Sequence, residues 1–231
     1  QGKIEFKNVS FTYPETGIQA LKNVSFVVNP GESLAIIGTT GSGKSTISTL
    51  IARLYDAREG EVLVDDIPIE QYNLHALRTQ IGYVPQEVFL FSDTIYNNIA
   101  FGLTDSHHEK IMGAAKDADV YDNIIAFPQG FETRIGERGI TLSGGQKQRV
   151  SIARALIPHP KIIIADEPVS MIDASLRMNI VNLFLSLKQE YNTSFLFITH
   201  DLATAYYVSD YIAVMYRGAI VEFGNARAIL T

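Results

Sequence analysis

The chain has 231 residues, of which 46% are hydrophobic and 19% charged, and its formal net charge is −6. This composition is ordinary for a globular domain, and the acidic balance argues against a nucleic-acid partner, because such proteins concentrate Lys and Arg. The absence of cysteine excludes disulfides and thiolate metal sites, and it is consistent with a cytoplasmic protein. No apolar run reaches the ~18 residues that a membrane span requires. The start, Gln1 to Glu5, has neither an initiator Met nor the apolar segment of a signal peptide, so we expect a domain of a longer protein.

The N-terminal part of the chain is rich in predicted strands. Residues 3–13 and 19–28 alternate apolar and polar side chains, which is typical of half-buried strands. We therefore expect an antiparallel β layer ahead of the main core. An apolar run at 34–37 and a helical pattern at 46–55 flank a glycine-rich turn. Further strands are predicted at 61–65 and 81–84.

The middle of the chain changes to a helical pattern. From about 94 to 156 the spacing of apolar residues favours helices, interrupted by Pro128–Gly130 and by the polar segment 136–139. We expect a helical subdomain, approximately residues 87–156, inserted into an α/β core. The chain has no repeat or long linker, so residues 1–231 are predicted to form one domain.

The core resumes after this insertion. Continuous apolar runs at 161–166 and 194–198 are typical of parallel strands that are buried on both faces. A closing hairpin is predicted at 211–223, with its turn at Arg217–Gly218. We expect the strand at 34–37 to lie beside both buried strands.

The glycine-rich turn matches the pattern G-x-x-x-x-G-K-[ST] between a strand and a helix, which is the context of a phosphate-binding loop. Glycines let successive N–H groups point at a polyphosphate, and the helix start adds unpaired donors and a dipole. Lys44 can reach the β- and γ-phosphates, and the Ser45 hydroxyl can ligate Mg²⁺. The loop consists of Gly38, Thr39, Thr40, Gly41, Ser42, Gly43, Lys44 and Ser45, followed by Thr46. We predict an α/β fold with a P-loop NTPase core, a mixed sheet, an N-terminal antiparallel β layer and an inserted α-helical subdomain, and we predict that it binds a nucleoside triphosphate.

Two carboxylates follow the predicted buried strand at 161–166. Asp166 and Glu167 stand at the carboxyl end of that strand, where α/β sheets place their ligands. Asp166 is suited to hold Mg²⁺, and Glu167 is suited to orient and deprotonate an attacking water. The alternative is a pair of solvated acids at a strand end, which the phosphate loop in the same chain makes the weaker interpretation.

A third motif lies far from the phosphate loop. Ser143, Gly144, Gly145 and Gln146 precede a helical segment, and such a start is an anion site or, taken alone, an ordinary loop-to-helix junction. Together with the residues that follow it up to Ala155, this motif resembles the signature of ATP-binding cassette (ABC) ATPases, the motors of ABC transporters. Four further positions match that family in order, although each alone has an ordinary structural explanation. They are Tyr13 (the aromatic that stacks on adenine), Gln86 (the Q-loop), Asp173 (the D-loop) and His200 (the switch histidine).

The resemblance implies a mechanism in which two cassette domains pair head to tail, as a homodimer or a heterodimer. ATP bound to one phosphate loop is then covered by Ser143 and the following glycines of the other domain. By resemblance Lys44 and Mg²⁺ stabilise the γ-phosphate, Glu167 polarises the water and His200 contacts the γ-phosphate. The resemblance also gives Mg²⁺ the ligands Ser45, Gln86 and Asp166.

The resemblance also implies a partner and a location. The segment around Gln86 would contact a transmembrane transporter domain, and the cassette would work on the cytoplasmic side at the inner face of the membrane.

The two halves of the chain resemble different branches of this family. Residues 1 to about 150, with the segments 84–99 and 136–139, resemble exporters, whereas residues from about 156 to 231 resemble oligopeptide importer ATPases. Exporters usually have Ala-Thr after the catalytic Glu and Arg after the switch His, where this chain has Pro168-Val169 and Asp201. One hypothesis is therefore a recombined or engineered domain, and the other is a divergent natural sequence.

Two other functions compete with a transporter ATPase. A soluble cassette ATPase acting in DNA repair or on ribosomes would usually carry large insertions, tandem cassettes or basic faces, which this compact acidic chain lacks. A nucleotide-binding module without turnover is disfavoured because both Glu167 and His200 are present.

Overall fold

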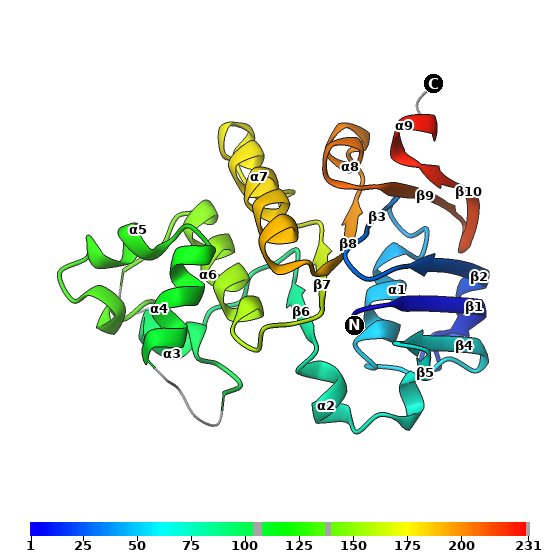
Figure 1. The fold of residues 1–231 in the computed structure, drawn as a ribbon, viewed down its shortest axis with the longest axis horizontal. Coiled ribbons are helices and arrows are strands. Elements are labelled where there is room, and N and C mark those ends of the chain that lie inside the picture. Colours follow the sequence, from blue (N-terminus) through cyan, green and yellow to red (C-terminus); the bar gives the residue numbers. More distant parts are fainter. Residues whose placement is uncertain (104–107, 137–139, 230–231) are drawn as a thin grey trace.

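The computed structural model describes residues 1–103, 108–136 and 140–229 of the chain. Two β-sheets lie at one side and in the middle of the molecule, and a group of helices forms the opposite end (Figure 1). Within these residues no helix combines the length and the hydropathy needed to cross a membrane.

The N-terminal strands form a four-stranded antiparallel sheet in the order β2-β1-β4-β5. Its strands are β1 (Ile4–Thr12), β2 (Gln19–Val28), β4 (Glu59–Val64) and β5 (Ile67–Pro68). The alternating side chains of β1 and β2 bury one face of this sheet and leave the other at the surface. The predicted antiparallel layer is confirmed.

The central sheet has six strands in the order β10-β9-β3-β8-β7-β6. Its strands are β3 (Ser33–Gly38), β6 (Ile81–Val84), β7 (Ile162–Asp166), β8 (Ser194–Thr199), β9 (Tyr211–Tyr216) and β10 (Ala219–Asn225). All neighbouring pairs are parallel except the closing hairpin of β9 and β10. Every residue of β7 and β8 is buried, which confirms both predicted buried strands. The antiparallel pairing of β9 with β10 confirms the predicted hairpin.

One prediction about this sheet is wrong in part. Strand β3 pairs with β8 and β9, so that Ile36 lies opposite Ile198 on one side and Ala213 on the other. The strand that ends in Asp166 is one position further along, because β8 separates it from β3. Apolar runs identify buried strands but carry no information on their order, which tertiary packing decides.

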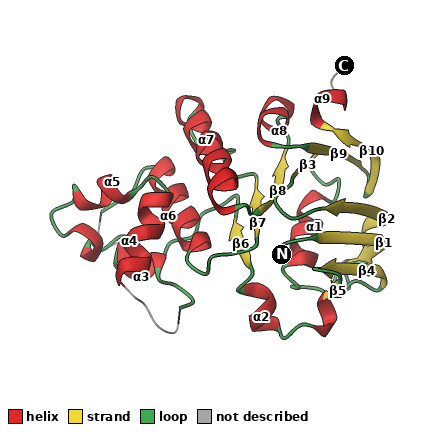
Figure 2. Cartoon of the chain, viewed as in Figure 1, coloured by secondary structure: helices red, strands yellow, loops and turns green. Residues whose placement is uncertain are grey.

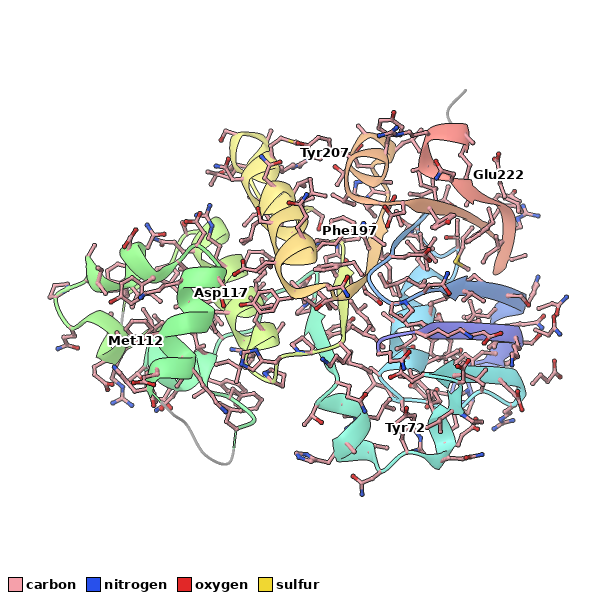
Figure 3. All side chains as sticks on the ribbon, viewed as in Figure 1. Tyr72, Met112, Asp117, Phe197, Tyr207 and Glu222 are labelled. Atoms are coloured by element: carbon pink, nitrogen blue, oxygen red, sulfur yellow. The ribbon has the colours of Figure 1, made fainter. Side chains whose placement is uncertain are left out.

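The central sheet separates two hydrophobic cores. Side chains from alternate positions of β7 and β8 point to opposite faces, as the pleat of a strand requires. Ile164 and Ile198 join a core shared with the antiparallel sheet and the first helix, whereas Phe197 joins a core under the other helices. Phe197 is labelled in Figure 3. In that second core the centroids of its ring and of the Phe184 ring lie 5.6 Å apart.

Helices cover both faces of the central sheet and form the far end of the molecule (Figure 2). The α-helices are α1 (Lys44–Ile51), α2 (Leu74–Arg78), α3 (Ile95–Ile99), α4 (His108–Asp117), α5 (Tyr121–Ile125), α6 (Gly144–Leu156), α7 (Ala174–Tyr191), α8 (Leu202–Val208) and α9 (Ala226–Ile229). Two short 3₁₀ helices, η1 (Ile69–Gln71) and η2 (Gly130–Glu132), complete the set within the described residues.

Helices α3 to α6 gather at the end opposite the antiparallel sheet (Figure 1), so the helical pattern predicted from about 94 to 156 is confirmed. The bounds of a subdomain at 87 and 156, and the single-domain division of 1–231, stay predictions. Residues 137–139 of the segment used for the exporter resemblance lie outside the described residues. The mixed α/β fold class is confirmed.

Candidate functional site

The candidate site is a cleft of about 650 Å³ at the carboxyl end of strand β3. Its walls come from the loop before α1, the start of β2 and the turn between β9 and β10. The lining residues are Tyr13, Ile18, Gln19, Ala20, Lys22, Thr40, Gly41, Gly43, Lys44, Ser45, Thr46, Gln86, Glu167, Arg217 and Gly218. A cleft of this size is typical of small-molecule sites.

The glycine-rich loop has the backbone that a phosphate cradle needs. Gly41 and Gly43 have φ angles of 78° and 100°, which other residues rarely adopt. A Cβ atom on Gly43 would also lie 2.4 Å from the Ala20 carbonyl oxygen, so no other residue fits at the start of α1. The ammonium of Lys44 donates to the carbonyls of Gly38 (2.8 Å) and Thr39 (3.0 Å). It therefore lies folded across the loop, within reach of an anion that the loop would hold.

The Asp166 carboxylate does not line the cleft but lies beside the lining residue Ser45, and it is buried to 7% exposure. The hydroxyls of Ser45 (3.4 Å), Ser48 (3.4 Å) and Tyr83 (3.3 Å) surround it. Burial raises the pKa of Asp166, because it disfavours the charged form; the hydroxyl of Ser45 opposes this shift. The carboxylate is thus held among weak donors in a setting where a cation would be strongly attracted.

Two of these hydroxyls were missed from the sequence. Ser48 lies three residues after Ser45 on α1 and therefore shares its face, a signal that helical spacing could have provided. Tyr83 comes from β6, which pairs with β7. Only the order of the strands brings its phenol to Asp166. Burial, followed by the charge of Asp166, raises the pKa of Tyr83, so the phenol stays protonated and donates.

Glu167 and His200 meet because their strands are neighbours in the sheet. They follow β7 and β8, and the Glu167 N–H donates to the Ile198 carbonyl at 2.8 Å. The His200 Nδ1 and Glu167 Oε2 atoms lie 3.2 Å apart, with Glu167 17% and His200 60% exposed. Glu167 has a φ of 44°, which is uncommon for a residue with a side chain.

The residues present fit a Mg²⁺ ion that is shared with a nucleotide. No group of three His, Cys, Asp or Glu side chains converges within the described residues as a self-sufficient metal site. Mg²⁺ typically takes only one or two protein oxygens and completes its shell with phosphates and water. The Ser45 hydroxyl and the Asp166 carboxylate, 3.4 Å apart, offer such a pair, and Gln86 lines the same cleft.

Tyr13 lies at the mouth of the cleft. Its hydroxyl is 3.0 Å from the Thr46 hydroxyl on α1. The rings of Phe11 and Tyr55 contact it edge-on, with centroids 5.0 and 5.4 Å away. This packing fixes the ring while leaving it available to a planar ligand.

The predicted signature residues form a second group outside this cleft. Ser143 caps α6: its hydroxyl accepts from the Gln146 N–H, and the Gln146 side chain accepts from the Ser143 N–H. Cβ atoms on Gly144 and Gly145 would lie 3.5 Å from the Met171 carbonyl and 3.4 Å from Leu176. The signature is therefore adjacent to the segment that leads into α7, whose N-cap is Asp173. None of Ser143 to Gln146, nor Asp173, lines the cleft.

These features are those of a P-loop nucleotide-binding domain: the glycine-rich loop before α1, the acid pair Asp166–Glu167 and the largely parallel sheet. The family model described as ABC transporter matches residues 21–170, so the chain belongs to the ABC transporter family.

Individual relatives point to the exporter branch. The chain is 44% identical over 230 residues to the ABC transporter ATP-binding protein YfiB of Bacillus subtilis, and 43% identical over 231 residues to an ATP-dependent lipid A-core flippase of Hahella chejuensis. Each match covers the whole chain and 39% of the relative. The solved structure of a bacterial Atm1-family ABC exporter with ATP bound superposes with a TM-score of 0.89 and 38% identity, covering all of this chain and 40% of that one.

These comparisons confirm the resemblance to ABC cassette ATPases and its exporter branch. The chain spans about two fifths of the length of these relatives. The matches run from end to end and do not separate the two halves of the chain, so the recombination hypothesis stays a prediction.

Proposed function

We propose that this chain binds ATP with Mg²⁺, hydrolyses it, and thereby drives an exporter-type ABC transporter. One observation carries the proposal: Lys44, Ser45 and Glu167 line a single cleft, and each acidic or hydroxyl member has its partner beside it, Asp166 at 3.4 Å from Ser45 and His200 at 3.2 Å from Glu167. Phosphoryl transfer needs little covalent chemistry from the protein, and it depends on positioning and on neutralising charge. The convergent groups supply both.

The loop and Lys44 bind the phosphates. N–H groups of the loop and the start of α1 point at the β-phosphate, and Lys44 exchanges its two carbonyl partners for the γ-phosphate. Ser45, Asp166 and Gln86 would hold Mg²⁺, and the bound ion would supply positive charge that neutralises the phosphates. Tyr13 stacks on the adenine.

Glu167 and His200 act on the attacking water. Glu167 accepts a proton from a water molecule placed in line with the γ-phosphate. Loss of this proton makes the oxygen of the water a better nucleophile. His200 holds the Glu167 carboxylate from the side through Nδ1. Because its side chain is 60% exposed, His200 has room to turn toward the γ-phosphate and report its presence.

The signature group completes the site of a second copy. Ser143 accepts a hydrogen bond from Gln146 but retains its own hydroxyl hydrogen, which can be donated to a phosphate. Ser143, Gly144, Gly145 and Gln146, with Asp173 beside them, lie outside the cleft of their own chain. A head-to-tail dimer would bring them over the ATP of the partner, as a homodimer or with a related cassette.

The surface that follows Gln86 fits a membrane-domain partner. Phe89 is 68% and Phe91 37% exposed, three and five residues after Gln86, which lines the cleft. One relative that is 44% identical over 225 residues is described as a multidrug export ATP-binding/permease protein of Bacillus subtilis. We therefore place this cassette at the cytoplasmic face of a membrane, joined to a transmembrane domain through this surface.

An ATPase assay with and without vanadate tests the proposal. We expect Mg²⁺-dependent release of phosphate that vanadate inhibits, because vanadate mimics the phosphoryl group in transfer. Nucleotide binding without turnover would instead identify a binding module and contradict the hydrolytic role.

A further inference from the structure

The part of the cleft wall formed by β2 and the β9–β10 turn carries two cations that no motif predicts. Lys22 and Arg217 line the cleft together with Lys44, and among the described residues the acidic groups there are Glu167, which lines it, and Asp166, which is buried 3.4 Å from the lining residue Ser45. The cleft therefore has an excess of positive charge in a chain whose net charge is −6. This local charge favours a ligand with several negative charges.

Backbone contacts fix this wall to the phosphate loop. The Gly218 N–H donates to the Ser42 carbonyl at 2.9 Å, and the Lys22 N–H donates to the Gly218 carbonyl at 2.7 Å. A Cβ atom on Gly218 would lie 2.8 Å from the Ala20 carbonyl oxygen. The phosphate loop, the start of β2 and the β9–β10 turn are therefore in close backbone contact. The fold thus fixes where the backbones of Lys22 and Arg217 lie relative to the loop.

The Arg217 side chain is oriented but not neutralised. Its guanidinium lies over the Tyr216 ring, 5.2 Å from the ring centroid, a contact that leaves the positive charge intact. The backbone of Arg217 has a φ of 47°, which is uncommon for a residue with a side chain. Across the described ranges 1–103, 108–136 and 140–229, neither the Arg217 guanidinium nor the Lys22 ammonium forms an ion pair.

We propose that Arg217, with Lys22, forms a second phosphate-binding wall of the cleft and strengthens binding according to the number of phosphate groups on the nucleotide. The inference rests on the proposed nucleotide site and adds residues outside the phosphate loop. Both cations contact the phosphate chain from the side of β2 and the β9–β10 turn, while Lys44 contacts it from the loop. Neither takes part in the chemistry of hydrolysis.

Calorimetric titration of the 231-residue chain with ATP, ADP and AMP tests this. Arg217→Gln and Lys22→Gln remove the charges at exposed positions, so folding is not at risk, and Arg217→Lys restores the charge. We expect each neutral variant to weaken ATP binding about two- to fivefold, as exposed ion contacts do. The double variant should multiply the two losses, the effect on AMP should be smaller than on ATP, and Arg217→Lys should recover most of the affinity.

The matched control is Lys161→Gln, an exposed lysine before the start of β7, at the opposite end of that strand from Asp166. It should leave ATP affinity unchanged. Raising the salt concentration should reduce the difference between wild type and Arg217→Gln, because exposed charges are screened. An Arg217→Gln variant with wild-type ATP affinity, or one that weakens AMP as much as ATP, would overturn the inference while leaving an active wild-type ATPase in place. Absence of ATP binding by the wild-type chain would overturn the proposed function itself.

Discussion

The cleft and the signature group differ in how complete they are within one chain. At the cleft, Lys44, Glu167 and the adjacent Asp166 all have partners inside the chain, and three neighbouring strands bring them together. The signature group has a well-formed local structure, the capping box of Ser143 and Gln146, but none of its residues lines the cleft. Both groups have residues suited to bind a phosphate, but only the first lies at a cleft that could hold a nucleotide within one chain.

This difference suggests where binding energy is used. A prebuilt cleft binds nucleotide without large rearrangement, so its affinity depends on groups already in place. An anion site that is exposed at a helix start gains its ligand only when another molecule brings one. We therefore expect substitutions in the cleft to affect binding and chemistry in a single chain, and substitutions in the signature group to affect assembly.

Glu167→Gln should have the largest effect. The substitution keeps the size of the side chain but removes the base that accepts the proton of water, so turnover should fall about 10²-fold or more. ATP affinity should stay near that of the wild type. Phosphate release measured beside calorimetric ATP binding checks both, and wild-type hydrolysis in the variant would remove Glu167 from its role.

Asp166→Asn should abolish the Mg²⁺ dependence of turnover and lower the turnover rate about 10²-fold, because a metal contributes several kcal/mol to charge stabilisation.

The pH dependence of stability gives a second measurement on the same variant. Burial raises the pKa of Asp166, so the folded state binds its proton more tightly than the unfolded state does. The free energy of unfolding should therefore decrease as pH rises through this raised pKa, and the decrease should be absent in Asp166→Asn. Thermal unfolding across pH measures it, and an equal pH dependence in both proteins would contradict the assignment.

Lys44→Ala should weaken ATP binding about 10- to 100-fold, in line with the loss of a hydrogen bond to a charged group. Calorimetry with ATP checks this. A control is Lys161→Ala, at an exposed position away from the cleft. Unchanged ATP affinity in Lys44→Ala would count against the folded-over lysine as a phosphate ligand.

Ser143→Arg should leave nucleotide binding by one chain unchanged and prevent assembly. We expect the chain to be mainly monomeric without nucleotide and Glu167→Gln to dimerise with ATP. Adding Ser143→Arg should abolish that dimer, because it places bulk at the shared phosphate. Ser186→Arg, on the exposed face of α7, provides a matched substitution elsewhere. Light scattering that shows a dimer indifferent to ATP, or continued dimerisation after Ser143→Arg is added, would contradict the division between the two regions.

Asp201→Ala should have the smallest effect. Asp201 caps α8 by accepting from the Ala203 N–H at 3.0 Å and from the Thr204 hydroxyl at 2.6 Å. Loss of such a cap costs about 0.5–2 kcal/mol of the free energy of unfolding. The Thr204 hydroxyl is the main cause that lowers the pKa of Asp201, so the capping contribution is present above the ordinary pKa of Asp and is lost as pH falls through the lowered value. Chemical denaturation at neutral and acidic pH checks both. A variant that unfolds like the wild type would show that the cap contributes nothing, and equal ATP binding in the two proteins would show that the effect is confined to stability.

Much of the cleft could be predicted from local sequence because its parts are local. The loop from Gly38 to Ser45 carries its own backbone requirements, and continuous apolar runs mark β7 and β8 as buried. Since the carboxyl ends of parallel strands share one edge of a sheet, residue order alone was enough to place Asp166 and Glu167 near the loop. The functional interpretation needed only residue types and their spacing.

Tertiary structure decided everything that depends on the order of the strands. Periodicity shows whether a strand is buried but not which strand lies beside it, so the position of β8 between β3 and β7 was not predictable. That order brings Tyr83 to Asp166 and His200 to Glu167, and the β9–β10 turn brings Arg217 to the cleft. The sequence by itself therefore determined the class of ligand and the residues of each motif. The fold determined which side chains lie together at the cleft and which lie outside it, because side chains far apart in sequence meet only when long-range packing fixes the arrangement of the sheet.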